Sequence, residues 1–286
     1  MPFDPEKLLK RRFGEVSHVI TRRDTILYAL GVGYGSDPMD RDELKLVYER
    51  DLVAAPTMAA VLGTPGSWLH DPELGVDWVK IVHGEQAVTI HRPLPVAGTV
   101  IGRMRVTGIH DKGPGKGALV VTTREVVHQG TGELLATTMQ SAFCRGDGGC
   151  GGSTGPAPVP PRMPERAPDL AVELPTLPQA ALIYRLSGDS NPLHIDPDIA
   201  TAAGYPRPIL HGLATFGVAG RALLRGVCGY DTTRLTAISG RFTAPVYPGE
   251  SLRTEIWRDG STAFFRVRVV GRDVVALDNG RAEIAA

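Results

Sequence analysis

Hydrophobic and polar positions along this chain of 286 residues follow one order twice. Segments with helical spacing come first in each half, at 25–32 and 51–62 and again at 178–187 and 212–225. Segments typical of strands follow them, at 99–109, 118–127, 134–143 and 262–270. A parallel sheet would alternate strand and helix, whereas here helices precede consecutive strands. The pattern therefore predicts an α+β fold with an antiparallel sheet.

Two short stretches of similar sequence suggest that the halves are copies of one unit. LYAL at 27–30 corresponds to IYRL at 183–186, and PVAG at 95–98 corresponds to PVYPG at 245–249. Both similarities occur in the same order in the two halves and are separated by nearly the same number of residues. We interpret them as the trace of a duplication.

Glycine and proline are concentrated between the two halves. Residues 146–168 hold six of the 34 glycines and six of the 23 prolines. Glycine favours a flexible chain and proline an extended one, so this segment is predicted to be an exposed Gly/Pro-rich linker. It divides the chain into a first unit, 1–145, and a second unit, 169–286.

The glycines of the second unit's longer helix call for an explanation. Gly217 and Gly220 lie within 212–225, where glycine costs about 1 kcal/mol relative to alanine. Close approach of another backbone would justify them, so we expect this helix to lie tightly against a curved sheet.

Composition excludes several classes of protein. Thirty-one basic and 31 acidic residues give zero net charge, which argues against a basic nucleic-acid-binding surface. The apolar fraction of 42% is too high for a disordered chain, and no apolar run approaches the roughly 18 residues of a membrane span. Three cysteines make a disulfide scaffold improbable. The ends show neither a secretory signal nor a peroxisomal address, so a cytoplasmic location is expected.

The densest polar cluster lies at 184–196, YRLSGDSNPLHID. Asp189 and His194 form a natural acid/base pair, because a carboxylate beside an imidazole can hold a water and relay its proton. Asn191 can orient either partner, and Pro192 stiffens the loop. Downstream, Gly212 opens the glycine-rich helix, where a free N–H and the helix dipole favour negative charge. We therefore predict an oxyanion site at Gly212.

Simpler interpretations of these residues remain open. Asp189 and Asn191 are also typical of helix caps and Asx turns. A calcium loop fails, because His194 stands where glycine is needed and Ala200 where glutamate is needed. Zinc would require more ligands than His194 and its neighbours offer. The glycines at 31, 33 and 35 resemble a dinucleotide-binding loop only superficially, because they follow a helix.

The cluster resembles a known family signature. YRLSGDSNPLHIDP at 184–197 is similar to the motif of the R-specific 2-enoyl-CoA hydratases, also called hydratase 2 or MaoC-like dehydratases. Further matches occur at 28–33, 83–86, 93–95, 111–113, 207–217 and 241–249. The resemblance covers nearly the whole chain and is strongest to the two-repeat form, like the hydratase part of peroxisomal multifunctional enzymes.

The resemblance implies a double hotdog fold: two units, each a helix wrapped by an antiparallel sheet, with one active site. It implies that Asp189 and His194 are catalytic, that the Gly212 N–H binds the thioester oxyanion, and that Asn191 supports the site. Four other positions fall where relatives contact the acyl-CoA: His83, Gly84, Lys112 and Phe242. A solvated turn lysine, a core aromatic and a structural histidine remain the plain alternatives for Lys112, Phe242 and His83.

The resemblance also implies an activity. The reaction is reversible addition of water to a trans-2-enoyl-CoA, giving the (3R)-3-hydroxyacyl-CoA, within fatty-acid metabolism. It needs no cofactor or metal, and a homodimer is expected. The first unit lacks the Asn-Pro-x-His pattern after Leu30, so we predict one site per chain and room in the first unit for an acyl tail. The alternatives are a hotdog thioesterase and a non-catalytic subunit that binds acyl thioesters.

Overall fold

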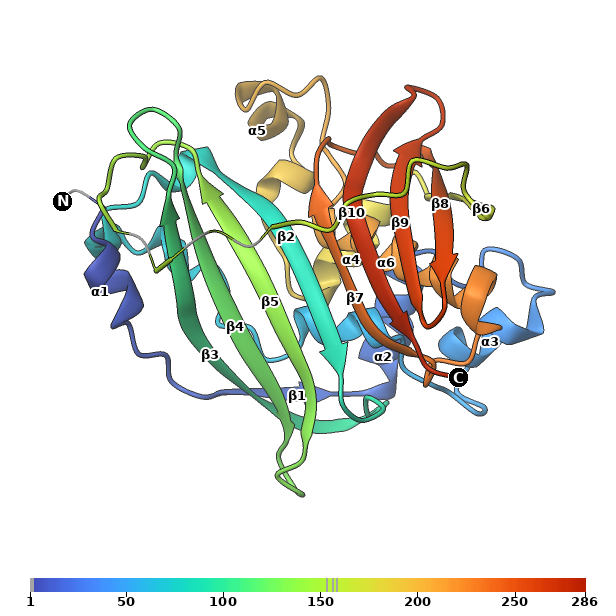
Figure 1. Cartoon of the computed structure of the whole chain (residues 1–286). Helices are drawn as coiled ribbons and strands as arrows, with labels where there is room; N and C mark the ends of the chain where they lie inside the picture. Colours follow the sequence, from blue (N-terminus) through green and yellow to red (C-terminus); the bar gives the residue numbers. More distant parts are fainter. Residues whose placement is uncertain (1–2, 153, 156, 158) are drawn as a thin grey trace.

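The computed structural model describes residues 3–286 except 153, 156 and 158. Its centre is one ten-stranded sheet in which every recorded strand pair is antiparallel, so the predicted α+β class is confirmed (Figure 1). The strand order is β1-β3-β4-β5-β2-β7-β10-β9-β8-β6. The first unit supplies β1 (Val16–Ile20), β2 (Ile81–Ile90), β3 (Gly98–Asp111), β4 (Ala118–His128) and β5 (Leu134–Cys144). The second supplies β6 (Leu170–Pro175), β7 (Leu235–Phe242), β8 (Ser251–Asp259), β9 (Thr262–Val269) and β10 (Val274–Ile284).

The two half-sheets join through β2 and β7. Glu85 pairs with Arg241 at one end of this ladder and Thr89 pairs with Ala237 at the other. The backbone hydrogen bonds of both central strands are thereby satisfied, and the two units share one continuous sheet. Residues at the start of β2 and the end of β7 consequently lie side by side.

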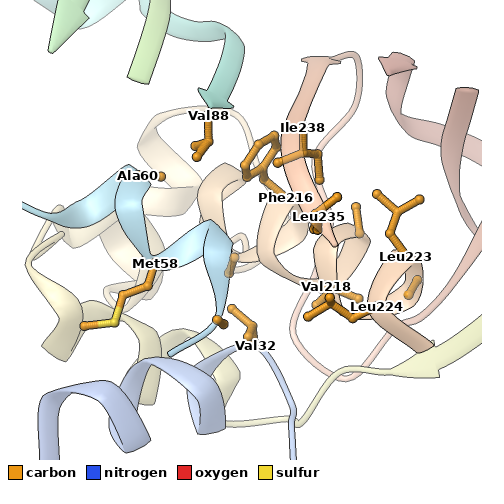
Figure 2. Packing of buried hydrophobic residues seen from close by; sticks show 14 of the residues in the cluster. Val32, Met58, Ala60, Val88, Phe216, Val218, Leu223, Leu224, Leu235 and Ile238 are labelled. Atoms are coloured by element: carbon orange, nitrogen blue, oxygen red, sulfur yellow. The ribbon is translucent and has the colours of Figure 1, made fainter. Parts of the chain in front are cut away.

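The second unit contains the long helix that the sequence predicts. This helix, α6 (Gly212–Leu223), continues as a π-helical turn, η7 (Leu224–Cys228), and packs against β6, β7, β8 and β10. Phe216 and Leu223 on α6 are fully buried. Figure 2 shows Phe216 beside Val88 of β2 and Ile238 of β7, so the core continues across the junction of the units.

The glycines of α6 make room for side chains rather than for another backbone. A Cβ on Gly217 would lie 2.4 Å from a methyl group of Val32, and one on Gly220 would lie 2.5 Å from the methyl group of Thr57. Both neighbours belong to the first unit. The expected close approach therefore exists, but it is an approach of the other unit's side chains.

The first unit departs from the predicted helix at 51–62. Its helical part is only η1 (Pro56–Val61), a 3-10 helix that begins at a proline and has no side-chain cap. Six residues without a cap make few helical hydrogen bonds, and η1 packs against β2, β5 and α6. The prediction of a second long helix here is wrong.

The remaining helices are short. The segment predicted at 25–32 is α2 (Arg22–Gly31), which begins with a capping box between Thr21 and Asp24. The segment predicted at 178–187 is α4 (Ala180–Tyr184) followed by η5 (Arg185–Ser187). The others are α1 (Pro5–Leu9), α3 (Arg41–Val47), η2 (Trp68–His70), η3 (Pro72–Leu74), η4 (Trp78–Lys80), η6 (Pro192–His194) and α5 (Pro197–Ala202). No helix of the described ranges is both long and apolar enough to cross a bilayer.

The glycine- and proline-rich segment at 146–168 contains no helix or strand in its described part, and it crosses one face of the sheet toward β6 (Figure 1). Its first half is held in place, which differs from the flexible tether expected there. The Asp111 carboxylate accepts hydrogen bonds from the N–H groups of Gly149 and Gly151, at 2.8 and 2.9 Å. The N–H of Thr154 donates to the carbonyl of Ile109.

Candidate active site

The motif loop begins where η5 ends at Gly188, whose φ of 112° suits glycine. The Asn191 side chain caps η6 by accepting the Leu193 N–H at 3.1 Å, and the Asn191 N–H donates to the Asp189 carboxylate at 3.2 Å. The Asx-turn interpretation is thus correct for both residues. It does not exclude a chemical role, because the same turn holds the Asp189 carboxyl in place while leaving it partly exposed.

His194 is buried at the end of η6, with 9% of its surface exposed. Its Nδ1 lies 2.9 Å from the carbonyl oxygen of Ile209, so Nδ1 carries the proton and donates it. The Nε2 lone pair is then available to a reactant. Desolvation lowers the pKa of His194, and the nearby Asp189 carboxylate opposes that shift. The imidazole is therefore neutral at neutral pH and can accept a proton.

His211 is a third member of the site. It was not among the site residues predicted from the sequence. Its ring stacks on His194 with centroids 3.8 Å apart and an interplanar angle of 29°. Its Nε2–H donates to the Asp189 carbonyl at 3.0 Å. Burial and the neighbouring His194 lower the pKa of His211 to about 4, so this ring is also neutral. The feature of the sequence that could have indicated this role of His211 is its place directly before Gly212, the glycine that opens the helix.

Asp189, His194 and His211 bring one potential ligand atom each within 4.8 Å of one another. One carboxylate and two imidazoles are side chains that can bind a metal ion, but the geometry of the stacked rings does not suit one. Imidazole lone pairs lie in the ring plane, and two nearly parallel stacked planes do not converge on one ion. The arrangement fits a water molecule better.

Gly212 is the first residue of α6, and its N–H has no acceptor among the hydrogen bonds of the described residues. The His211 side chain does not cap this helix. A Cβ at Gly212 would lie 3.3 Å from the Phe242 ring, so any larger residue would press on that ring. A free N–H at a helix N-terminus can stabilise a developing oxyanion.

His83 and Phe242 meet at the junction of β2 and β7. Their ring centroids are 4.7 Å apart in an edge arrangement, and the His83 Nε2–H donates to the Glu85 carbonyl at 3.1 Å. Desolvation lowers the pKa of His83 to about 4, with Asp189 acting in the opposite direction. The structure therefore brings His83 into the electrostatic range of Asp189, and Phe242 into contact with both His83 and the Gly212 position.

Gly84 is the residue after His83 in β2, and Lys112 directly follows the end of β3. The β2–β5 register shifts between His83 and Glu85, and a Cβ at Gly84 would lie 2.7 Å from the Ser141 hydroxyl. Lys112 is exposed, and its Nζ lies 5.3 Å from the Phe143 ring centroid. Phe143 pairs with Val82, the residue before His83. No described contact joins Lys112 to the Asp189–His194 pair.

Comparison with known proteins agrees with this geometry. Residues 160–279 match the family described as "MaoC like domain", and residues 18–146 match "MFE-2 hydratase 2 N-terminal domain". A "3-hydroxyacyl-thioester dehydratase Y" of Mycobacterium tuberculosis is 43% identical over 93% of both chains. The chain belongs to the MaoC-like hydratase 2 family. An "Enoyl-CoA hydratase 2, peroxisomal" of Arabidopsis thaliana is 39% identical over 96% of this chain and 94% of that protein.

Solved structures establish the fold of this hydratase 2 family member. A MaoC-like dehydratase from Phytophthora capsici superposes with a TM-score of 0.87 at 33% identity, covering 99% of this chain and 98% of that one. A Mycobacterium tuberculosis protein described as having a double hotdog fold gives a TM-score of 0.60 at 16% identity, with 96% of both chains covered. The predicted double hotdog architecture and the family resemblance are confirmed.

Proposed function

We propose that this chain catalyses reversible hydration of trans-2-enoyl-CoA thioesters to (3R)-3-hydroxyacyl-CoA in fatty-acid metabolism. One observation carries the proposal: Asp189 and His194 converge with His211, the residue directly before Gly212, and the Gly212 N–H has no acceptor among the described residues. This arrangement supplies a place for a water, a route for its proton and a donor for a thioester oxygen. The names of the hydratase and dehydratase relatives support the same assignment.

The proposed chemistry balances within the site. The Gly212 N–H stabilises negative charge on the thioester oxygen as water attacks C3. The proton of the water passes to the Asp189–His194 pair, and the pair returns a proton to C2, so both side chains end as they began. His194 accepts through Nε2 because its Nδ1–H is committed to the Ile209 carbonyl. The proposal includes no resident cofactor or metal, so turnover should survive exhaustive treatment with a chelator.

The first unit is proposed to receive the acyl chain. A cavity of about 200 Å³ is lined by Tyr28, Met58, Val61 and Leu62 of this unit, together with residues 186–188, which directly precede Asp189. The cavity therefore adjoins the catalytic loop and extends into the unit that lacks its own acid/base pair. This adjacency supports acyl-chain accommodation as the role of the first unit. Turnover should then be better with a medium-chain enoyl-CoA than with crotonyl-CoA.

We also propose that the chain forms a homodimer and acts in the cytoplasm. Leu30 of α2 and Leu182 and Leu186 at α4 and η5 are 39%, 56% and 58% exposed, and these helical elements pack against one another. Apolar surface of this kind supports self-association. Light scattering after size-exclusion chromatography tests the first statement, and cell fractionation tests the second.

The deciding experiment is a hydration assay across enoyl-CoA chain lengths with chiral analysis of the product. Asp189→Asn and His194→Gln should each reduce turnover by at least about 100-fold, the usual contribution of a positioned acid/base group. Asp198→Asn and His91→Gln are matched controls, because both side chains are exposed and lie outside the cluster. Release of free CoA instead of loss of the enoyl absorbance would identify a thioesterase. Acyl-CoA binding without turnover would identify a binding subunit.

A further inference from the structure

The cavity of the first unit has a polar wall as well as an apolar one. Met58, Val61 and Leu62 form its apolar part, while His18 of β1 and Asp24 of α2 also line it. A plain alkyl chain would need only the apolar part. The two titratable side chains therefore require a separate explanation.

His18 offers the cavity a hydrogen-bond donor. It pairs across the sheet with Val100, which is fully buried, so its side chain lies on the inner face of β1. Its Nδ1 accepts the N–H of Gly63 at 3.2 Å, so the proton of the neutral ring is on Nε2. No described residue accepts a hydrogen bond from that Nε2–H. Desolvation and, to a smaller extent, the nearby Arg124 lower the pKa of His18, while Asp24 opposes the shift.

Asp24 offers an acceptor beside it. Its Oδ2 receives both the N–H and the hydroxyl of Thr21, at 2.9 and 2.6 Å, which holds the pKa of this carboxyl below its ordinary value. Its Oδ1 has no hydrogen-bond partner within the described ranges. His18 and Asp24 line the same cavity, and each acts on the pKa of the other, so the free donor and the free acceptor belong to one polar wall.

An alkyl tail laid against these two groups would remove their water without replacing its hydrogen bonds, which is unfavourable. A carboxylate would be repelled by Asp24, and an ammonium group would leave the His18 donor unmatched. A hydroxyl group satisfies both, because it accepts from the His18 Nε2–H and donates to Asp24 Oδ1.

We infer that the cavity of the first unit is a hydroxyl-binding site, and that the enzyme prefers enoyl thioesters whose acyl chain carries a hydroxyl group remote from the reacting double bond. The inference rests on the proposed function, because it concerns the distal part of the same substrate. His18 and Asp24 become the residues that determine this specificity.

The test compares trans-2-enoyl-CoAs of six to twelve carbons with their ω-hydroxy counterparts of equal length. At the length that reaches the site, kcat/KM should be about tenfold higher for the hydroxylated substrate, mainly through a lower KM. His18→Leu, which removes the donor, and Asp24→Ala, which removes the acceptor, should each bring the ratio of the two substrates close to one. His91→Leu, on an exposed histidine away from the cavity, should keep the wild-type ratio.

The outcomes separate this inference from the proposed function. Crotonyl-CoA carries one carbon beyond C3 and no distal hydroxyl group, so its hydration reports on the catalytic pair and not on hydroxyl recognition. If crotonyl-CoA is hydrated but no ω-hydroxy substrate exceeds its alkyl counterpart, the hydroxyl site is refuted and the hydratase stands. A preference that persists in both variants refutes the roles of His18 and Asp24. Failure of every substrate, including crotonyl-CoA, refutes the proposed function instead. The wild-type comparison remains decisive even if His18→Leu does not fold.

Discussion

The imidazole rings of His194 and His211 stack with their centroids 3.8 Å apart. The second ring also donates a hydrogen bond to the backbone carbonyl of Asp189 and directly precedes Gly212 in the chain. One side chain thus connects the acid/base pair with the donor for the thioester oxygen. Its own pKa of about 4 keeps it uncharged, so it does not repel a protonated His194.

His211 should therefore act as a positioning residue. His211→Phe keeps an aromatic ring against His194 but removes the donor to Asp189, and it should lower kcat by about tenfold with little change in KM. His211→Ala removes ring and donor and should lower kcat further. Steady-state kinetics of both variants test this order. An alanine variant with wild-type kcat would contradict it, as would a loss confined to KM.

A buried ion pair connects the two units. Arg221 of α6 and Glu43 of α3 are 2% and 1% exposed, and Arg221 Nε lies 2.7 Å from a Glu43 carboxylate oxygen. Arg221→Met leaves the Glu43 charge buried without its main partner, which should lower the free energy of unfolding by about 3–5 kcal/mol. The double variant Arg221→Met/Glu43→Leu should lose less than the single variant. Urea denaturation measures both, and equal losses would show that the stranded charge is not the cause.

Gly33 should be irreplaceable for a steric reason. Its φ is 91°, and a Cβ there would lie 2.7 Å from the Arg221 guanidinium. Gly113 is the matched control, because its φ is 94° and nothing lies within 4 Å of an added Cβ. Gly113→Ala should cost only the backbone strain, about 1–2 kcal/mol. Gly33→Ala should cost more, since overpacking adds about 1–3 kcal/mol. Equal unfolding midpoints for the two variants would refute this explanation.

Stability should fall as the pH is lowered from about 6.5 to about 4. Burial lowers the pKa of His83 and of His211 to about 4, against 6.5 in the unfolded chain. Between these values the unfolded state binds more protons, so acid favours unfolding, and below pH 4 the effect levels off. His83→Gln removes one of the two groups and should reduce the pH dependence of the urea midpoint. A midpoint with the same pH dependence in the variant and the wild type would exclude His83 as a source.

The motif loop illustrates what could be predicted from the residues. The six positions from Asp189 to His194 predicted that these two side chains share one stiff loop, and the structure brings them together with His211. The strand at 262–270 was predictable because its buried and outer positions alternate, and the strand at 118–127 because it is rich in valine and threonine. The helix at 51–62 was not, because Pro56 and packing against α6 override a periodic pattern.

The glycines at 31, 33 and 35 show the limit of local patterns. Their spacing resembles a dinucleotide loop, yet Gly33 accommodates Arg221 and the Gly35 N–H donates to Glu43 at 2.9 Å. Arg221 lies almost 190 residues beyond Gly33 in the chain, so no local pattern indicates that contact.

The sequence by itself determined the family and the α+β class and indicated the candidate loop, because these depend on short segments whose spacing is fixed by the backbone. Only the tertiary structure decided that His211 stacks on His194, that Arg221 pairs with Glu43, and that His18 and Asp24 share one cavity. All three depend on how segments pack, and the Arg221–Glu43 pair also requires the two units to come together. Such distances are set by packing of the whole chain, and local residue patterns carry little information about them.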